Sequence, residues 1–415
     1  MTLITVVFVL VYLGMLLGRL PALRMDRTGI ALLGALTLVA AGSVSVLDAQ
    51  DSIDVPTIAL LFGMMVVSAQ LRLGGFYVQV TSSLARLPIS PVMLIGAIIG
   101  MVGLLSAVFT NDVVCLAVAP VLIDMARRRQ LDPIPFLLAL ACASNVGSAA
   151  TLIGNPQNIL VGQALQLGFL EYLKVAWIPT VVGLLVIWGV LALDRRRRGS
   201  WGTGRDSHNE PDSGHSSTSE SGGPRFDRWQ AGKGLGVSAI VLVAFLFTSW
   251  PRELVALGAA GALLTSRKVG SRDMLGLVDW QLLVLFIGLF VVNDAFERTG
   301  FPEQGVQTLR AMGISLNDLP TLLITTVVLS NMVSNVPAIM LLLPGVTHPM
   351  AGPTLALAST FAGNFLIVGS IANILVVETA AREGIPIGWR EHARIGVPVT
   401  ILTLAVAGIA LWLYA

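Results

Sequence analysis

Four clusters of small polar residues interrupt apolar stretches of this sequence and supply side chains that could bind a ligand. Two are short: Thr110-Asn111-Asp112 and Ser334-Asn335-Val336-Pro337. The other two run from Ser144-Asn145 to Gly154-Asn155-Pro156-Gln157-Asn158 and from Gly363-Asn364 to Gly369-Ser370-Ile371-Ala372-Asn373. A polar group without a partner in an apolar setting is costly, so each cluster needs a structural or functional reason.

The two short clusters fit the turns of two helical hairpins. A hairpin tip leaves helix-end N–H and C=O groups free, and Ser, Thr and Asn side chains can cap them. Capping without any ligand is therefore one interpretation. The other is that two tips meeting from opposite faces enclose a polar cavity, in which Thr110, Asn111, Asp112, Ser334 and Asn335 bind substrate. Na⁺ ligands in such a cavity would be Asn111, Asp112 and Asn335.

The two longer clusters predict broken helices, because Gly-Asn-Pro within an apolar segment ends a helix. The half-helix that follows offers N–H groups and a partial positive charge suited to an anion. The opened carbonyls could hold Na⁺ instead, and a kink that serves only packing is a third interpretation. The candidate binding residues are Asn145, Gly154, Asn155, Asn158, Asn364, Gly369, Ser370 and Asn373.

Acidic residues are few within the apolar segments. Asp112 could bind a cation or exchange a proton, or it could cap the second arm of its hairpin. We expect Asp294 at a solvated span end, Glu378 at a cytoplasmic exit and Asp124 in an ion pair with one of Arg127, Arg128 and Arg129. Cys115 and Cys142 are expected to pack without forming a disulfide. No nucleotide-binding loop, catalytic triad or metal-ligand spacing is present in the sequence, which disfavours an enzyme and an ATP-driven pump.

Membrane helices must position these clusters. Of the 415 residues, 55% are hydrophobic and 12% are charged, and the mean hydropathy is +0.81. A soluble domain carries about 25% charged residues. Several apolar stretches approach the roughly 20 residues that cross a bilayer as a helix. The composition therefore predicts an all-α polytopic membrane protein.

The basic residues divide into two sets of loops. Alternate loops hold 22 of the 26 Lys and Arg residues and the other loops hold 4, and cytoplasmic loops are those that collect basic residues. The alternation works only if residues 91–126 and 320–348 each enter the membrane, turn and leave on the same side. The pattern thus predicts ten spans, two re-entrant hairpins of opposite orientation and both termini outside the cytoplasm.

The two halves of the sequence match at nearly constant spacing. Gly63, Ser106 and Asn158, for example, recur as Gly288, Ser330 and Asn373. Each half holds an odd number of spans, so the second copy must be inverted. We expect a first repeat over residues 1–198, a flexible cytoplasmic linker over 199–232 and an inverted second repeat over 233–415.

The run Ala141–Asn158 and the run Ser330–Pro337 resemble the ion transporter superfamily. That group includes arsenite efflux pumps, sodium/proton antiporters and divalent anion/sodium symporters, and the likeness covers the chain except the linker. The Gly-Asn-Pro-Gln-Asn run is most similar to a bacterial "anion transporter" branch. The resemblance implies an elevator mechanism, hairpin tips that hold Na⁺ and substrate, and a homodimer. The second tip here lacks the final hydroxyl of the symporter motif, which leaves proton coupling through Asp112 open.

Together these features predict a secondary transporter of the bacterial inner membrane that moves a small inorganic or organic anion, coupled to H⁺ or Na⁺. It would need no cofactor beyond the coupling ion and would bind no nucleic acid. A sodium/proton antiporter that uses Asp112 is the alternative, and a channel is the option from another class.

Overall fold

The computed structural model describes residues 2–18, 25–198, 226–311 and 315–414, and the regular elements in these ranges are helices. Those of the first half are α1 Thr2–Leu17, α2 Arg27–Ala40, α3 Val46–Asp51, α4 Val55–Leu73, α5 Phe76–Ala85, α6 Pro91–Val108, α7 Asn111–Arg128, α8 Ile134–Ser148, α9 Pro156–Ala164 and α10 Phe169–Arg198. Those of the second half are α11 Arg228–Phe247, α12 Arg252–Leu264, α13 Ser271–Leu275, α14 Trp280–Glu297, α15 Phe301–Ala311, α16 Leu319–Val333, α17 Asn335–Leu342, α18 Ala351–Ala362, α19 Ile371–Arg382 and α20 Trp389–Tyr414.

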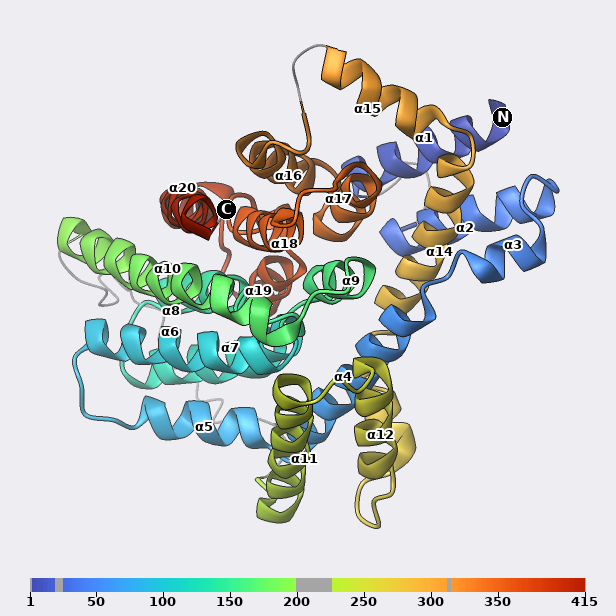
Figure 1. Ribbon diagram of the computed structural model, residues 1–415. Coiled ribbons are helices and arrows are strands. Elements are labelled where there is room, and N and C mark those ends of the chain that lie inside the picture. The colour runs from blue at the N-terminus through green and yellow to red at the C-terminus, as the bar shows by residue number, and fades with distance from the viewer. Residues whose placement is uncertain (1, 19–24, 199–225, 312–314, 415) are drawn as a thin grey trace.

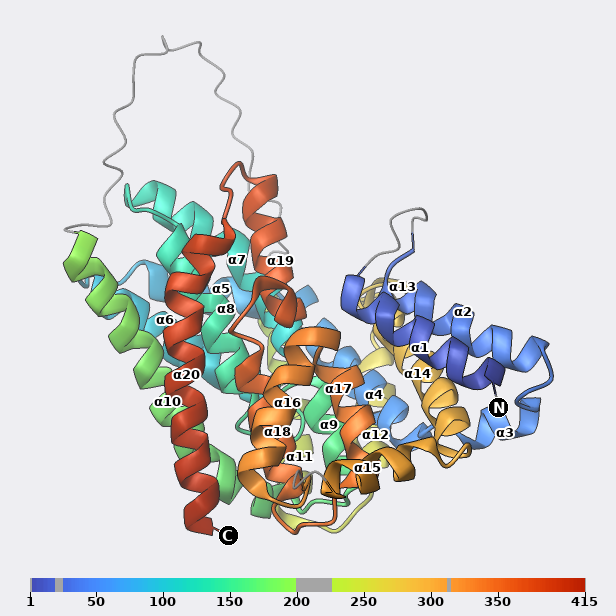
Figure 2. The same ribbon diagram turned by 90° about the horizontal axis from the view of Figure 1, so that it is seen from above.

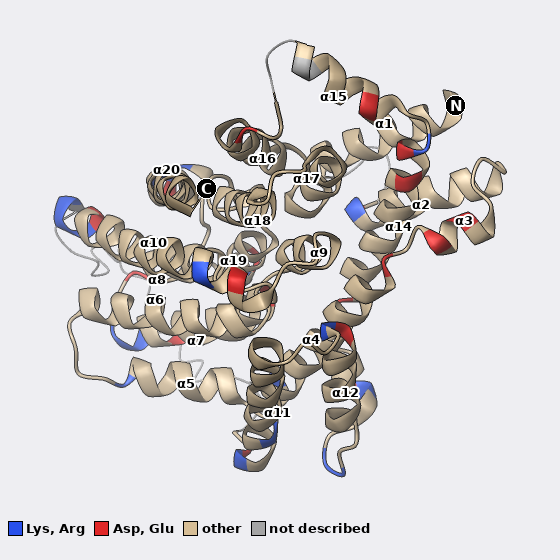
Figure 3. Cartoon of the chain, viewed as in Figure 1, with Lys and Arg blue, Asp and Glu red and all other residues tan. Residues whose placement is uncertain are grey.

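Apolar helices confirm the membrane character of the chain. Within the described ranges, α4, α6, α10, α11, α14 and α20 are long and apolar enough to cross a membrane, and α1, α2, α8 and α16 are shorter apolar helices. Charged side chains gather toward the ends of the helices, and most of their length is uncharged (Figure 3). The protein is therefore an all-helical, polytopic membrane protein.

The expected linker lies largely outside the described residues. Of the segment 199–232, residues 199–225 are not described. Helix α11 already begins at Arg228, because the Asp227 carboxylate accepts hydrogen bonds from the backbone N–H groups of Trp229 and Gln230. The boundary at 232 was wrong by one helical turn, since this aspartate caps the helix.

The helices form two groups that lie side by side in both views (Figure 1, Figure 2). We call α1–α4 with α11–α14 the crossed-helix group and α6–α10 with α16–α20 the hairpin group. In the crossed-helix group, α12 packs on α4 and α2 packs on α14. A Cβ atom at Gly63 would lie 2.7 Å from the backbone of Ala256, and one at Gly288 would lie 2.8 Å from the backbone of Ala31. Only glycine allows these two close crossings.

The segments 91–126 and 320–348 each turn back on themselves, as the sequence predicts. At the open end of the first hairpin, the Arg129 guanidinium donates to the carbonyls of Ala85 and Leu87 at 2.5 and 2.6 Å. At the open end of the second, the Thr347 N–H donates to the Asn317 side chain at 2.9 Å. In each hairpin the residues before the first arm therefore lie next to those after the second.

Candidate substrate and ion site

The break between α8 and α9 is held open by two asparagine side chains. Asn155 caps α9 by accepting a hydrogen bond from the Asn158 N–H at 2.9 Å. The Asn158 amide in turn donates to the free carbonyls of Ser148 and Thr151 at 3.3 and 3.0 Å. The predicted broken helix is confirmed, and its backbone groups find partners within the segment.

The break between α18 and α19 repeats this arrangement. The Asn373 amide donates to the carbonyls of Gly363 and Leu366 at 2.7 and 3.2 Å. Each of these three residues lies 215 positions after its counterpart in the first break. The two breaks are thus stabilised by the same hydrogen bonds at matching positions.

A buried polar network joins the two breaks. The Asn145 amide donates to the side chains of Asn364 and Asn373 at 2.9 and 3.0 Å, and its oxygen accepts from the Ser370 hydroxyl at 2.8 Å. Thr360, which is 215 positions after Asn145, contacts Asn155 at 3.2 Å and Asn158 at 3.3 Å. Each half therefore contributes one residue that binds the broken helix of the other half.

Thr360 was missed by the sequence analysis, in which the second of the two longer clusters begins at Gly363-Asn364. The hydrogen bonds make Thr360 the counterpart of Asn145, so the second cluster begins earlier than expected. The spacing of 215 positions that relates Asn158 to Asn373 would have identified it. Asn364 instead lies where the first half has Ala149.

The tip of each hairpin rests on a break. The Asn111 N–H donates to the Gly154 carbonyl, and the Asn111 amide donates to the Asn145 oxygen, both at 3.2 Å. A Cβ atom at Gly154 would lie 2.3 Å from the Ser148 carbonyl oxygen, so only glycine fits there. At the other tip, the Asn331 amide donates to the Ala362 carbonyl at 3.3 Å. The predicted tip and break residues are brought together.

Several buried polar atoms at the tips and in the second break have no hydrogen-bond partner in the described structure. They are Thr110 Oγ1, Asn111 Oδ1, Asn335 Oδ1 and Asn364 Nδ2. Neither Thr110 nor Ser334 caps its helix through the side chain. A buried unsatisfied group costs about 1–3 kcal/mol, so simple capping does not account for these residues. A bound ion or solute would satisfy them.

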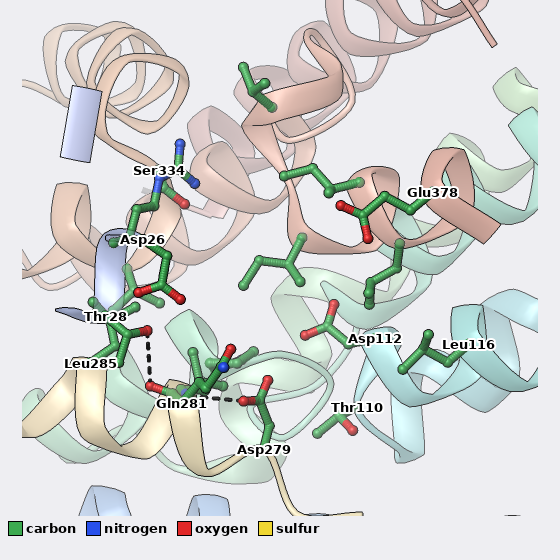
Figure 4. Close-up of a pocket in the computed structure, with 18 of the residues that line it drawn as sticks. Asp26, Thr28, Thr110, Asp112, Leu116, Asp279, Gln281, Leu285, Ser334 and Glu378 are labelled. Carbon is green, nitrogen blue, oxygen red and sulfur yellow. Dashed lines mark hydrogen bonds between the residues drawn. The ribbon is translucent and has the colours of Figure 1, made fainter. Parts of the chain in front are cut away.

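A cavity of about 830 Å³ lies between the two groups and reaches both hairpin tips. Thr110 and Asp112 line it from the first hairpin and Ser334 and Val336 from the second (Figure 4). The first residues of both half-helices, Pro156 and Ile371, also line it. Residues at the N-termini of α7, α9, α17 and α19 therefore all line this cavity.

Charged residues surround the cavity. Asp112 and Glu378 face it from the hairpin group, and Asp26 and Asp279 face it from the crossed-helix group (Figure 4). Asp26 and Asp279 cap α2 and α14 by accepting from the N–H groups three residues on. Asp112 forms no hydrogen bond or ion pair within the described chain, so the alternative interpretation of Asp112 as a helix cap is wrong. Thr110 occupies the cap position and Asp112 lies in the first turn.

The cavity also has basic and neutral polar residues. Arg27 and Arg72 line it, and the Arg27 side chain donates to the Met15 carbonyl at 3.3 Å. The Thr28 hydroxyl donates to the Gln281 carbonyl at 3.3 Å (Figure 4). Sequence reasoning did not associate these residues with the tips, because they lie at the ends of helices that are distant in the chain.

The remaining predicted acids and the cysteines lie as expected. Asp124 pairs with Arg128 at 2.8 Å, and Asp294 pairs with Arg298 at 2.8 Å with both side chains partly exposed. Cys115 and Cys142 are buried free thiols. Asp124 and Asp294 are therefore satisfied by neighbouring arginines and do not face the cavity.

The known proteins to which this chain is similar include membrane transporters. The chain is 32% identical to a 46 kDa membrane protein of Mycobacterium leprae over 94% of both chains. It is 28% identical to the silicon efflux transporter LSI3 of rice, over 93% of this chain and 92% of that one. The crystal structure of the Alcanivorax borkumensis YdaH transporter has the same fold, with a TM-score of 0.55 at 16% identity over 99% of this chain and 98% of that one.

The citrate transporter (CitMHS) model matches residues 8–362. This match covers both hairpins and the first break, and it confirms the resemblance to the ion transporter superfamily. The relatives are membrane transporters rather than enzymes. The chain therefore belongs to the citrate transporter family of membrane transport proteins.

Proposed function

We propose that the protein is a secondary active transporter that moves a small inorganic or organic anion of low charge across the bacterial inner membrane. The observation that carries this proposal is that residues at the N-termini of four helices, α7, α9, α17 and α19, line one cavity. Helix N-termini carry a partial positive charge that favours an anion.

The cavity itself argues for low substrate charge. Its lining has four carboxylates and two guanidinium groups, so a highly charged anion would meet repulsion on the way to the tips. A small anion, or the acid from which it forms, would meet amides, hydroxyls and helix N-termini there. The binding residues in this proposal are those of the two tips and the two breaks, with Asn111, Asn335 and Asn364 contacting substrate.

The architecture proposed for this transport is that of two inverted repeats, residues 1–198 and 233–415, with ten spans and two hairpins. Three features support it: matching hydrogen bonds at the breaks, the reciprocal Asn145 and Thr360 contacts, and the paired glycine crossings. The hairpin group would move past the crossed-helix group as an elevator. A homodimer, a cytoplasmic linker and external termini complete the proposal.

A sodium/proton antiporter is the second candidate. The specific observation in its favour is the Asp112 carboxylate, which lines the cavity without a hydrogen bond or ion pair among the described residues. Such an acid can exchange a proton or hold Na⁺. In the anion transporter, the same carboxylate would couple substrate to H⁺ or Na⁺.

Flux measurements in proteoliposomes separate these functions. We expect labelled arsenite or silicate to accumulate when a pH or Na⁺ gradient is imposed, and to equilibrate without one. Na⁺/H⁺ exchange that no added solute alters would favour the antiporter. Ohmic currents without coupling would contradict secondary transport.

A further inference from the structure

Helices α9 and α19 occupy matching positions in the two halves but are covered to different extents. All eight residues of α9 from Pro156 to Gln163 are buried, and α9 packs against α4. In the matching segment of α19, Ile371 to Glu378, five residues are partly or fully exposed, and Ile371, Ile374, Leu375, Val377 and Glu378 line the cavity. The cavity thus occupies the place where α19 would pack against α14.

Two polar contacts fasten the end of α9 to the start of α12. The Gln163 amide donates to the Glu253 carboxylate at 3.3 Å. The Arg252 guanidinium donates to the Leu167 carbonyl. Both contacts join the hairpin group to the crossed-helix group, so they close that side of the molecule in this conformation.

The counterparts of these residues face one another across the open cavity. Glu378 lies 215 positions after Gln163, the spacing that relates the two breaks. Arg27 and Thr28 lie 225 positions before Arg252 and Glu253, the spacing that relates Gly63 to Gly288. All three line the cavity, Glu378 from α19 and the other two from α2. Figure 4 shows Thr28 and Glu378 on opposite sides of the cavity.

Chemistry as well as position makes these three residues complementary. On the closed side, the Gln163 amide of the hairpin group donates to the Glu253 carboxylate of the crossed-helix group. On the open side the roles are reversed, because the acceptor, Glu378, lies on the hairpin group and the donors, Arg27 and Thr28, lie on α2. Their present partners are weak: Glu378 is 3.8 Å from Arg382, with side chains 58% and 80% exposed, and Thr28 donates to a carbonyl at 3.3 Å. Exposed pairs of this kind contribute about 0–1 kcal/mol, so they can be exchanged.

We propose that the cavity closes when Glu378 moves against α2 and binds Thr28 and Arg27, while the contacts of Gln163 with Glu253 and of Arg252 with Leu167 separate. The two sets of contacts would alternate, because two inverted copies of one unit can exchange conformations at no net structural cost. This inference rests on the inverted repeats of the proposed function and adds the residues that close each side.

Paired cysteines test the alternation in the full-length protein in membranes. One pair is Thr28→Cys with Glu378→Cys, and the matched control pair is Gln163→Cys with Glu253→Cys, both in a Cys115→Ala, Cys142→Ala background whose transport is verified first. A short bifunctional thiol reagent should crosslink the control pair, as this conformation predicts, and should also capture the first pair. In a protein carrying all four cysteines, the two crosslinks should exclude each other.

Two results would overturn the proposal. One is both crosslinks within the same molecule, and the other is no Thr28/Glu378 crosslink in a variant that still transports. Crosslinking is read without any transported solute, so a protein that alternates but moves no anion would contradict the proposed function and leave this inference intact.

Charge reversal gives a second test that does not depend on the cysteine variants. Arg27→Glu or Glu378→Arg alone should slow transport roughly tenfold, and the double reversal should restore most of the rate, as expected for a directly interacting pair. A double variant as slow as the slower single variant would contradict a direct contact.

Discussion

The two hairpin tips share their asparagines but differ on either side of them. Asn111 and Asn335 are both buried, and both leave the side-chain oxygen unpartnered. The next residue is Asp112 in the first tip and Val336 in the second, and both line the cavity. The preceding residue is Thr110 with ordinary backbone angles and Ser334 with φ 79° and ψ 161°.

This comparison separates two tasks. The repeated feature, an asparagine oxygen at each helix N-terminus, can bind Na⁺ or accept a hydrogen bond from a protonated ligand held between the tips. Two features occur only once: the acid Asp112 in the first tip and the strained backbone at Ser334 in the second. A feature present in one tip only suits the binding of a coupling ion, which needs one site. Backbone angles like those of Ser334 are adopted almost only by glycine and cost about 1–3 kcal/mol.

The largest expected effect comes from removing the shared feature. Asn111→Ala or Asn335→Ala should each reduce transport by about 100-fold, because each removes a buried contact to the ligand of up to about 3 kcal/mol. Initial rates of uptake into proteoliposomes measure this loss.

Size-exclusion profiles of both variants should match that of the native protein, which separates a loss of binding from a loss of folding. Normal transport by both variants would remove the tips from the site.

The acid in the first tip should affect coupling more than binding. Asp112→Asn should abolish the stimulation of uptake by an imposed pH gradient, since the variant cannot exchange a proton, while exchange of substrate across the membrane without a gradient should persist. Parallel uptake and counterflow assays measure the two activities.

Asp279→Asn is the matched control. Asp279 lines the same cavity and caps α14 through the Leu282 N–H at 3.0 Å, and asparagine caps a helix as well as aspartate does. This control should retain the pH response. If it lost the response and Asp112→Asn retained it, the coupling site would belong to the crossed-helix group.

The smallest effect concerns the strained backbone. Ser334→Gly should raise the free energy of unfolding by about 1 kcal/mol, because glycine adopts positive φ without strain. Ser334→Ala removes the same hydroxyl but keeps a Cβ atom, so it should bring no such gain. Thermal unfolding of the two purified variants measures the difference. Equal shifts would show that the Ser334 backbone is not strained.

Much of the site could be predicted from the sequence because it depends on local rules. The run Gly154-Asn155-Pro156 breaks its helix through local effects, since Asn155 caps α9 and Pro156 is its first residue, and the arginines require residues 91–126 to turn back. The match between halves then brings Asn158 and Asn373 into equivalent places.

Other parts of the site depend on packing between distant segments. Asp279 begins α14 and reaches the tips only because the crossed-helix group lies against the hairpin group. Thr360 is part of the network through its contacts with Asn155 and Asn158. Its role could be assigned only once the spacing of 215 positions was applied to α18 as well as to α19.

The proposed site requires that each hairpin enter and leave the membrane on one side, the first from the cytoplasm and the second from outside. Membrane-impermeant thiol labelling of Ser90→Cys, Gln130→Cys, Asn317→Cys and His348→Cys, one at a time in inside-out and right-side-out vesicles, tests this directly. We expect the first two to react only from the cytoplasmic side and the last two only from the opposite side. Labelling of Ser90→Cys and Gln130→Cys from opposite sides would mean that the first hairpin crosses the membrane, and the proposed site between the tips would be excluded.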